Sequence, residues 1–249
     1  MGVWYTFCVS VIVPAILPTS RADLEDKLAR ILGVAEDVQI DVVDGRYADT
    51  TSWPYVAGQS NEFSGMVARG ETLPWWGRFR FEIDLMVREP EAVAGMWIAL
   101  GASRLVFHAG SSDELPETIA HLQKKFGHDK DFAPDLLSFG VAIGTTTPFE
   151  TIAPLLPHVD FVQFMGINRI GRQGEAFNRH VLERIRSFSK EFRGVPIQVD
   201  GGVSLASAPD LLELGVSRLV VGSALWKSTD PKNTYEKFEQ LSERYGIYE

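Results

Sequence analysis

Three aspartates in this sequence lie at the ends of short apolar runs, where a carboxylate is costly to bury. They are Asp41, Asp84 and Asp200. Burying an ionised carboxylate in an apolar strand costs several kcal/mol of free energy unless the carboxylate is paired or bound to a cation. Three of them at corresponding positions favour one shared centre over three separate structural acceptors. The chemistry available to such a centre is proton transfer, cation binding or both.

Glycine turns follow the last two apolar runs and could bind a phosphate group. Gly201 and Gly202 come directly after Asp200, and Gly222 and Ser223 follow the final run. Glycine leaves the backbone N–H groups open to an anion, and the last two strands of α/β barrels commonly hold phosphate. His108 ends another apolar run, and the sequence is equally consistent with a core histidine and a site residue at that position.

The elements that must position these residues alternate between apolar, β-branched runs and amphipathic segments. We predict strands over Val9–Ala15, Val38–Val43, Phe81–Met86, Leu105–His108, Ser138–Ile143, Phe161–Met165, Ile197–Val199 and Leu219–Val221. Each is nearly continuous in apolar character, which is typical of strands covered on both faces. We predict helices over Arg21–Leu32, Glu91–Leu100, Glu114–Phe126, Phe149–Leu156, Ala176–Phe192, Ala206–Leu214 and Pro231–Tyr245.

This alternation predicts an α/β protein, a (β/α)8 TIM barrel. The length of 249 residues fits one such barrel, and no linker divides it, so we expect a single domain over residues 1–249. Gly33, Gly101, Gly194 and Gly215 follow predicted helices and are expected to end them. In a barrel, strand ends and the loops after them carry function.

One long connection, Arg46–Arg80, contains Trp53, Trp75 and Trp76 and a single helix candidate near Asn61–Arg69. A loop of this length on the catalytic face is commonly functional. Exposed tryptophans in a cluster are unusual unless something covers them. A lid over the site and a contact in a homo-oligomer are the two interpretations.

The bulk composition excludes several classes of partner. The net charge of -9 argues against nucleic acid and against an anionic membrane surface. A sole cysteine, Cys8, cannot form an intramolecular disulfide, and we expect a buried structural thiol in a cytoplasmic protein. The apolar run Val9–Leu17 has no basic residue before it and contains Pro14, so we expect a buried strand there and no signal peptide.

The sequence resembles the ribulose-phosphate 3-epimerase family over nearly its whole length. The matching pieces are Pro14-Ala15-Ile16-Leu17, Ile40-Asp41-Val42-Val43-Asp44-Gly45, Asp84-Leu85-Met86, Met165 through Asn168, Val199-Asp200-Gly201-Gly202 and Gly222-Ser223-Ala224. The resemblance implies an isomerase of carbohydrate metabolism that interconverts ribulose 5-phosphate and xylulose 5-phosphate. The two acid/base aspartates of the family correspond to Asp41 and Asp200. Substrate and phosphate contacts are implied for Met86, Met165, Gly166, Asn168, Gly201, Gly202, Gly222 and Ser223.

The sequence departs from the family at the expected metal site. The family holds a divalent metal with two histidines and two aspartates, but Gln39 and Asp84 stand where the histidines are expected. Ala15 stands where a serine is expected, and the loop after the sixth predicted strand carries an apparent one-residue insertion. A ligand set of Gln39, Asp41, Asp84 and Asp200 would suit Mg²⁺ or Mn²⁺ better than Zn²⁺ or Fe²⁺.

Three arrangements of this centre stay open from the sequence: a harder metal, no metal with a proton shared among the acids, or an arginine as counter-charge. Arg46, Arg169 and Arg172 are the candidates for the last. Two functions also stay open. One is an epimerase that proceeds through an enediolate at C3, and the other is a lapsed or repurposed barrel that binds a phosphorylated sugar. Decarboxylases and hexulose-phosphate synthases of related barrels need a lysine two residues after Asp84, where this chain has Met86.

Overall fold

The computed structural model describes residues 11–127 and 136–246. Cys8 and the beginning of the first predicted strand lie outside these ranges. Among the described residues, the helices are too short or too polar to cross a bilayer.

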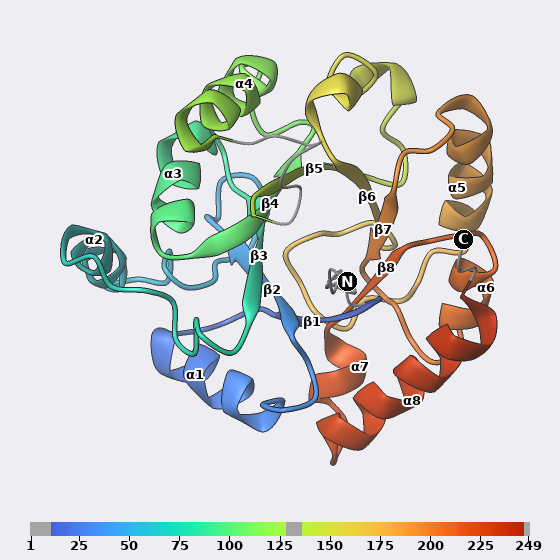
Figure 1. Ribbon diagram of the computed structural model, residues 1–249, viewed down its shortest axis with the longest axis horizontal. Helices are drawn as coiled ribbons and strands as arrows, with labels where there is room; N and C mark the ends of the chain where they lie inside the picture. The colour runs from blue at the N-terminus through green and yellow to red at the C-terminus, as the bar shows by residue number, and fades with distance from the viewer. Residues whose placement is uncertain (1–10, 128–135, 247–249) are drawn as a thin grey trace, which may run out of the picture.

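Eight parallel strands close into a barrel in which each strand pairs with the next and the last pairs with the first (Figure 1). The strands are β1 (Ile12–Ile16), β2 (Asp37–Val43), β3 (Arg80–Met86), β4 (Ala102–His108), β5 (Ser138–Ile143), β6 (Phe161–Met165), β7 (Ile197–Asp200) and β8 (Arg218–Val221). The predicted fold class is therefore confirmed, and every predicted strand exists.

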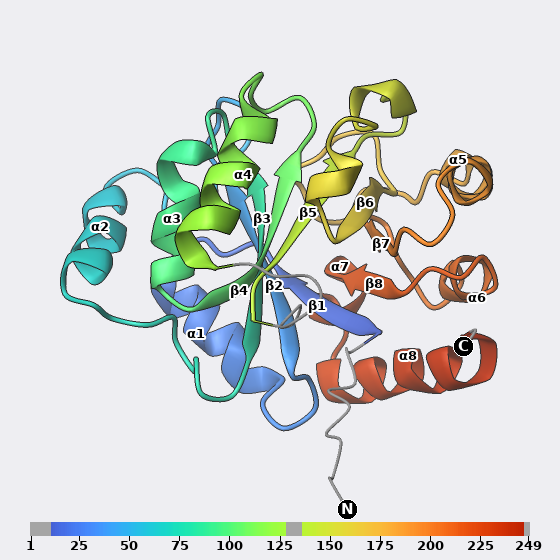
Figure 2. The same ribbon diagram turned by 45° about the horizontal axis from the view of Figure 1, so that its top comes forward.

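Helices surround the barrel, and α2 stands outside the ring beside α3 (Figures 1 and 2). The helices are α1 (Arg21–Arg30), α2 (Ser60–Ala68), α3 (Glu91–Ala99), α4 (Leu115–Phe126), α5 (His180–Glu191), α6 (Ala208–Leu212), α7 (Ser223–Trp226) and α8 (Pro231–Tyr245). The four glycines expected to end helices all have positive φ angles, between 79° and 101°. Glycine adopts this conformation without the steric cost that a side chain would add.

Two predicted helices are wrong in part. The segment Phe149–Leu156 forms two short 3-10 turns, η1 (Phe149–Thr151) and η2 (Leu156–His158), in place of one α-helix. Pro154 and Pro157 lack the N–H groups that an α-helix would need there. The helix predicted to begin at Ala176 begins at His180 as α5.

The side chains that face outward from the barrel pack against the helices in one large apolar core. Trp53 belongs to this core, because it is fully buried against Phe63 and Trp97. Trp75 and Trp76 are 44% and 54% exposed, and they lie in the connection that enters the N-terminal end of β3. These two tryptophans are therefore at the opposite end of the barrel from the strand ends that carry the aspartates, and they do not cover the site.

The inside of the barrel is more polar than the sequence suggested. Buried polar side chains on β2, β3, β6, β7 and β8 hydrogen-bond to one another across the barrel. The expectation of nearly continuous apolar strands is therefore wrong for the inward face. Several strands also begin one to three residues earlier than predicted, at charged or small residues, because inward partners such as Asp37 and Arg218 pair there.

Candidate active site

Three aspartates from separate strands meet at the C-terminal end of the barrel. Asp41 and Asp84 are directly paired in register on β2 and β3, and Asp200 is the last residue of β7. Each offers a carboxylate oxygen to a cluster in which the atoms lie within 4.8 Å of one another. All three side chains are buried. The structure thus brings together the residues that the sequence singled out.

Burial changes the acidity of the pair that faces the pocket. Burial raises the pKa of Asp41 to about 8, and the negative charge of Asp84 adds to the rise. Burial also raises the pKa of Asp200 well above its usual range, with Asp41 and Asp84 contributing. Neighbouring carboxylates that are withdrawn from water resist joint ionisation. The pair is suited to hold one proton between its two members.

The side-chain amide of Gln39 bridges this pair. Its Nε2 donates to Oδ1 of Asp41 at 2.8 Å and to Oδ2 of Asp200 at 3.0 Å. The amide therefore presents its two N–H groups to the carboxylates and turns its oxygen away from them. A cation ligand would have to present the oxygen. In this orientation Gln39 takes part in the centre as a hydrogen-bond donor.

Asp84 has its own partners. Nε2 of His108 lies 2.9 Å from Oδ1 of Asp84, and Nε2 of Gln163 donates to Oδ2 at 3.3 Å. The ring of Tyr47 covers His108, with 5.3 Å between the ring centroids. His108 thus contacts the carboxylate cluster through Asp84.

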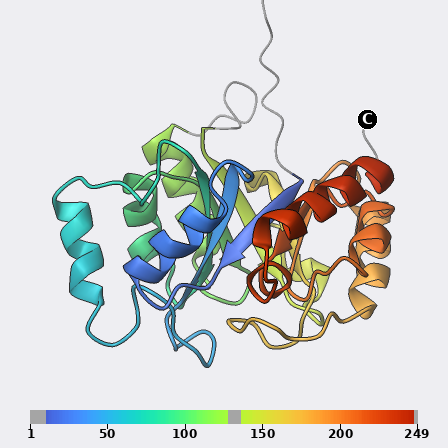
Figure 3. The same cartoon turned by 90° about the horizontal axis from the view of Figure 1, so that it is seen from below.

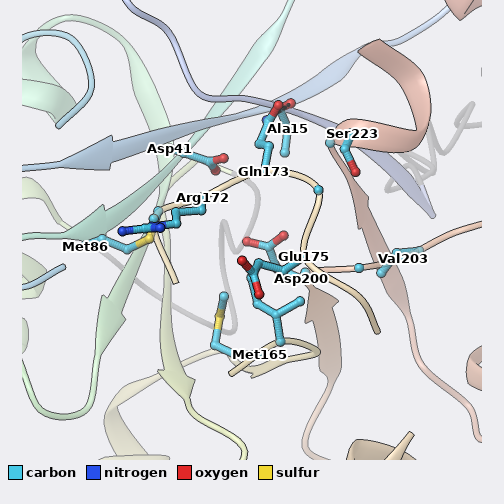
Figure 4. A pocket seen from close by; sticks show the side chains of 16 residues that line it. Ala15, Asp41, Met86, Met165, Arg172, Gln173, Glu175, Asp200, Val203 and Ser223 are labelled. Atoms are coloured by element: carbon cyan, nitrogen blue, oxygen red, sulfur yellow. Dashed lines mark hydrogen bonds between the residues drawn. The ribbon is translucent and has the colours of Figure 1, made fainter. Parts of the chain in front are cut away.

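A pocket opens above the carboxylates at this end of the barrel (Figure 4). Its lining includes Asp41 and Asp200, and it includes six of the eight residues expected to contact substrate: Met86, Met165, Gly201, Gly202, Gly222 and Ser223. Gly202 has a φ of +67°, and a Cβ there would lie 2.7 Å from the backbone of Phe177. Only glycine fits this turn, so the backbone can approach a ligand closely.

The other two expected contacts, Gly166 and Asn168, are outside the lining. A Cβ on Gly166 would lie 2.2 Å from the carbonyl oxygen of Gly201, so this glycine permits close packing of two turns. The side-chain oxygen of Asn168 accepts hydrogen bonds from Thr145 and Asn178. Both residues shape the loop after β6, and their contact with substrate stays a prediction.

The loop after β6 supplies one site residue that the sequence analysis did not select, Gln173, and one that it did, Arg172. Nε2 of Gln173 donates to the backbone oxygen of Ala15 at 3.3 Å, and Gln173 lines the pocket together with Asp41. Arg172 and Met86 both line the pocket (Figure 4). This loop and the loop after β2 occupy the same end of the barrel (Figure 3). The departure from the family's glycine-rich pattern was the available signal for these residues.

The three candidate counter-charges differ in their surroundings. Arg46 pairs with Glu89 at 3.4 Å, and Arg169 pairs with Glu175 at 2.7 Å, both on the surface. Glu175 lines the glycine end of the pocket, so its pairing with Arg169 offsets a charge that would repel phosphate. Among the three arginines, Arg172 is the one that reaches the pocket.

The comparison with protein families gives one match that covers most of the chain. The Ribulose-phosphate 3 epimerase family matches residues 11–226. The ribulose-phosphate 3-epimerase of Bacillus subtilis is 28% identical over 228 residues, which cover 89% of this chain and 94% of the relative. That of Schizosaccharomyces pombe is 26% identical over 224 residues, which cover 89% of each.

Solved structures agree on the fold. The 3-hexulose-6-phosphate synthase of Salmonella typhimurium superposes with a TM-score of 0.68 at 14% identity, covering 95% of this chain and 100% of the other. The 3-keto-L-gulonate-6-phosphate decarboxylase of Vibrio cholerae gives a TM-score of 0.64 at 13% identity, covering 95% of this chain and 99% of the other. Together with the family match over residues 11–226, the sequence relatives show that this chain belongs to the ribulose-phosphate 3-epimerase family, a family of isomerases.

Proposed function

We propose that this chain epimerises a ketose phosphate of the ribulose 5-phosphate/xylulose 5-phosphate type at C3. The observation that carries the proposal is the pair Asp41 and Asp200, which come from β2 and β7 and both line the pocket beside the glycine turns. Inversion at carbon needs an acid/base group on each face, because a single group returns the proton to the face from which it came.

The reaction moves one proton off C3 and another back on. An ionised carboxylate of the pair takes the C3 proton, the electron pair of the C–H bond forms a C2–C3 double bond, and the C2 carbonyl oxygen takes the negative charge. The C2 oxygen then re-forms the carbonyl, and the electron pair of the C2–C3 double bond takes the proton of the protonated partner on the opposite face of C3. The raised pKa values of Asp41 and Asp200 favour a pair with one member protonated and one ionised.

The glycine end of the pocket is assigned to the phosphate group. Gly201, Gly202, Gly222 and Ser223 line it together, and β7 and β8 are the strands after which barrels commonly bind phosphate. Backbone N–H groups bind an anion without a basic patch, which suits a chain with a net charge of -9.

The three carboxylates fit a hard divalent cation, because oxygen ligands suit Mg²⁺ or Mn²⁺ better than Zn²⁺ or Fe²⁺. Asp41, Asp84 and Asp200 would hold it, and when bound it would stabilise the negative charge of the enediolate. We expect the purified protein to bind Mn²⁺ reversibly and to retain no zinc. Metal analysis that finds one tightly held zinc per chain would contradict this assignment.

Deuterium exchange tests the proposed reaction directly. In D₂O, wild-type protein is expected to place deuterium at C3 of ribulose 5-phosphate, detected by NMR. Asp200→Asn should abolish interconversion of the two epimers, because only one face of C3 then has an acid/base group, and should leave phosphate binding nearly unchanged. Asp210→Asn, outside the pocket lining, should react normally.

A wild-type protein that exchanges no deuterium into any pentulose or hexulose phosphate would overturn the proposal. The alternative would then hold, a barrel that binds a phosphorylated sugar without turnover. The replacement of both expected histidines, by Gln39 and Asp84, is the observation that favours this alternative.

A further inference from the structure

A chain of buried side chains connects the floor of the barrel to the three carboxylates. At its lower end, Nε of Arg218 donates to Oε1 of Gln198 at 2.9 Å. Nε2 of Gln198 in turn donates to Oε1 of Glu82 at 2.5 Å and to Oε1 of Gln163 at 2.7 Å, and it approaches Oε1 of Gln39 at 3.4 Å. Gln39 and Gln163 then donate to the carboxylates described above. Every side chain in this amide relay is buried.

The direction of the relay follows from its lower end. A guanidinium group has only N–H donors. Arg218 therefore requires the oxygen of Gln198, and the NH₂ group of Gln198 must point the other way. That NH₂ group faces the oxygens of Glu82 and Gln163 and, at longer range, the oxygen of Gln39. The NH₂ groups of Gln163 and Gln39 therefore point toward the aspartates. Each amide has one donor end and one acceptor end, and the anchor at Arg218 fixes them in sequence.

Reversal of one amide would be costly. If the Gln39 amide turned over, its NH₂ group would meet the NH₂ group of Gln198, and its oxygen would meet two carboxylates. Buried polar groups that lose their partners cost about 1–3 kcal/mol each. The relay therefore opposes the orientation in which Gln39 could serve as a cation ligand.

We propose that Arg218 and Gln198 are positioning residues that hold Gln39 and Gln163 as hydrogen-bond donors to the reaction-centre carboxylates and keep the oxygen of Gln39 out of the cation site. The inference rests on the proposed function only in taking Asp41, Asp84 and Asp200 as the reaction centre. Its test measures cation affinity, so it can fail while the epimerase proposal stands.

A charge-neutral swap tests the relay. Oε1 of Glu82 accepts from Nε2 of Gln198 at 2.5 Å, so Glu82→Gln combined with Gln198→Glu exchanges donor and acceptor without changing the net charge. The carboxylate at position 198 still accepts from Arg218. It now also accepts from Gln39, which turns its oxygen toward Asp41 and Asp200.

Mn²⁺ affinity, measured by electron paramagnetic resonance, should increase at least tenfold in the swapped protein relative to the wild type. Adding Gln39→Leu to the swap should remove the gain, because the gain comes from the oxygen of Gln39. Glu82→Gln alone is the matched control and should not reproduce it. Equal affinity in wild type and swap, or a gain that survives Gln39→Leu, would overturn the proposal.

A second variant covers the case in which the swap does not fold. Gln198→Met removes the donor that holds Gln39 and adds no charge. The amide of Gln39 is then free to turn its oxygen toward a cation, so Mn²⁺ should bind several-fold more tightly than to the wild type. An unchanged Mn²⁺ affinity in Gln198→Met would also contradict the proposed role of the relay.

Discussion

Nε2 of His108 lies 2.9 Å from Oδ1 of Asp84, and both side chains are almost completely buried. We expect His108→Leu to lower the free energy of unfolding by about 3 kcal/mol, because it leaves a buried carboxylate without one of its partners. Urea denaturation measures the loss. His121→Leu, on the surface, should change stability by less than about 0.5 kcal/mol.

The effect of His108→Leu should depend on the charge at position 84. In an Asp84→Asn background the same substitution should cost less, since an amide tolerates the loss of a partner better than a carboxylate does. Equal losses in the two backgrounds would show that His108 acts through packing alone.

The raised pKa of Asp41 predicts how stability depends on pH. The folded protein holds a proton on Asp41 up to about pH 8, whereas the unfolded chain releases it near 3.8. The stabilising contribution of this proton is fully present at acid pH and is lost as the pH rises through the folded pKa. In the presence of a chelator, Asp41→Asn should melt close to wild type at pH 4 and higher at pH 9.

The gain at pH 9 should amount to several degrees, since about 1 kcal/mol corresponds to about 2–4 °C in a chain of this size. Thermal melts between pH 4 and 9 test this, with the exposed Asp26→Asn as control. A constant difference across the pH range would contradict the raised pKa.

Arg172 supplies positive charge at the pocket, and its loss should weaken substrate binding. A charge-assisted hydrogen bond contributes about 1.5–3 kcal/mol, so Arg172→Gln should raise KM for the phosphorylated sugar by about ten- to a hundredfold. Arg46→Gln removes the same charge at the same end of the barrel, but its side chain pairs with Glu89, and neither residue lines the pocket. Equal KM values for the two variants would exclude a specific role for Arg172.

A substitution at Gly202 tests whether the glycine end of the pocket binds phosphate. Gly202→Ala places a methyl group against the backbone of Phe177 at a φ of +67°, so the turn must move. The variant should lose the rise in melting temperature that inorganic phosphate gives the wild type. Gly33→Ala carries similar strain, at a φ of +85° with open space around it, and should retain the phosphate response. If both variants keep the rise in melting temperature that phosphate gives, Gly202 is not part of the phosphate site.

The sequence predicted the barrel well because strand periodicity and helix ends are local signals. The bounds of β5, β6 and α8 are those predicted, and the last helix begins at Pro231 after Asp230, whose side chain caps it. The helix predicted from Ala176 begins late for a tertiary reason. Asn178 donates its backbone N–H to Gly166 and caps His180, so the preceding residues are drawn toward the turn after β6.

The candidate site could be predicted from the sequence where a residue type is unusual in its surroundings. Asp41, Asp84 and Asp200 stand out because a carboxylate is unusual in an apolar strand. Gln163 and Gln198 gave no such signal, since a neutral amide in a strand is ordinary until its partners are known. Those partners come from strands far apart in the sequence, and only the closed barrel brings them within hydrogen-bond distance.

The carbonyl oxygen of Ala15 anchors two segments at the edge of the pocket, accepting from Gln173 at 3.3 Å and from the indole of Trp226 at 2.6 Å. Every amino acid carries this oxygen, so no substitution at position 15 removes it. The alanine that stands in place of the expected serine therefore leaves both anchoring contacts intact. The side chain itself is buried beside Val13 and Val220, so only small residues at position 15 would preserve the fastening of the loop after β6 to β1.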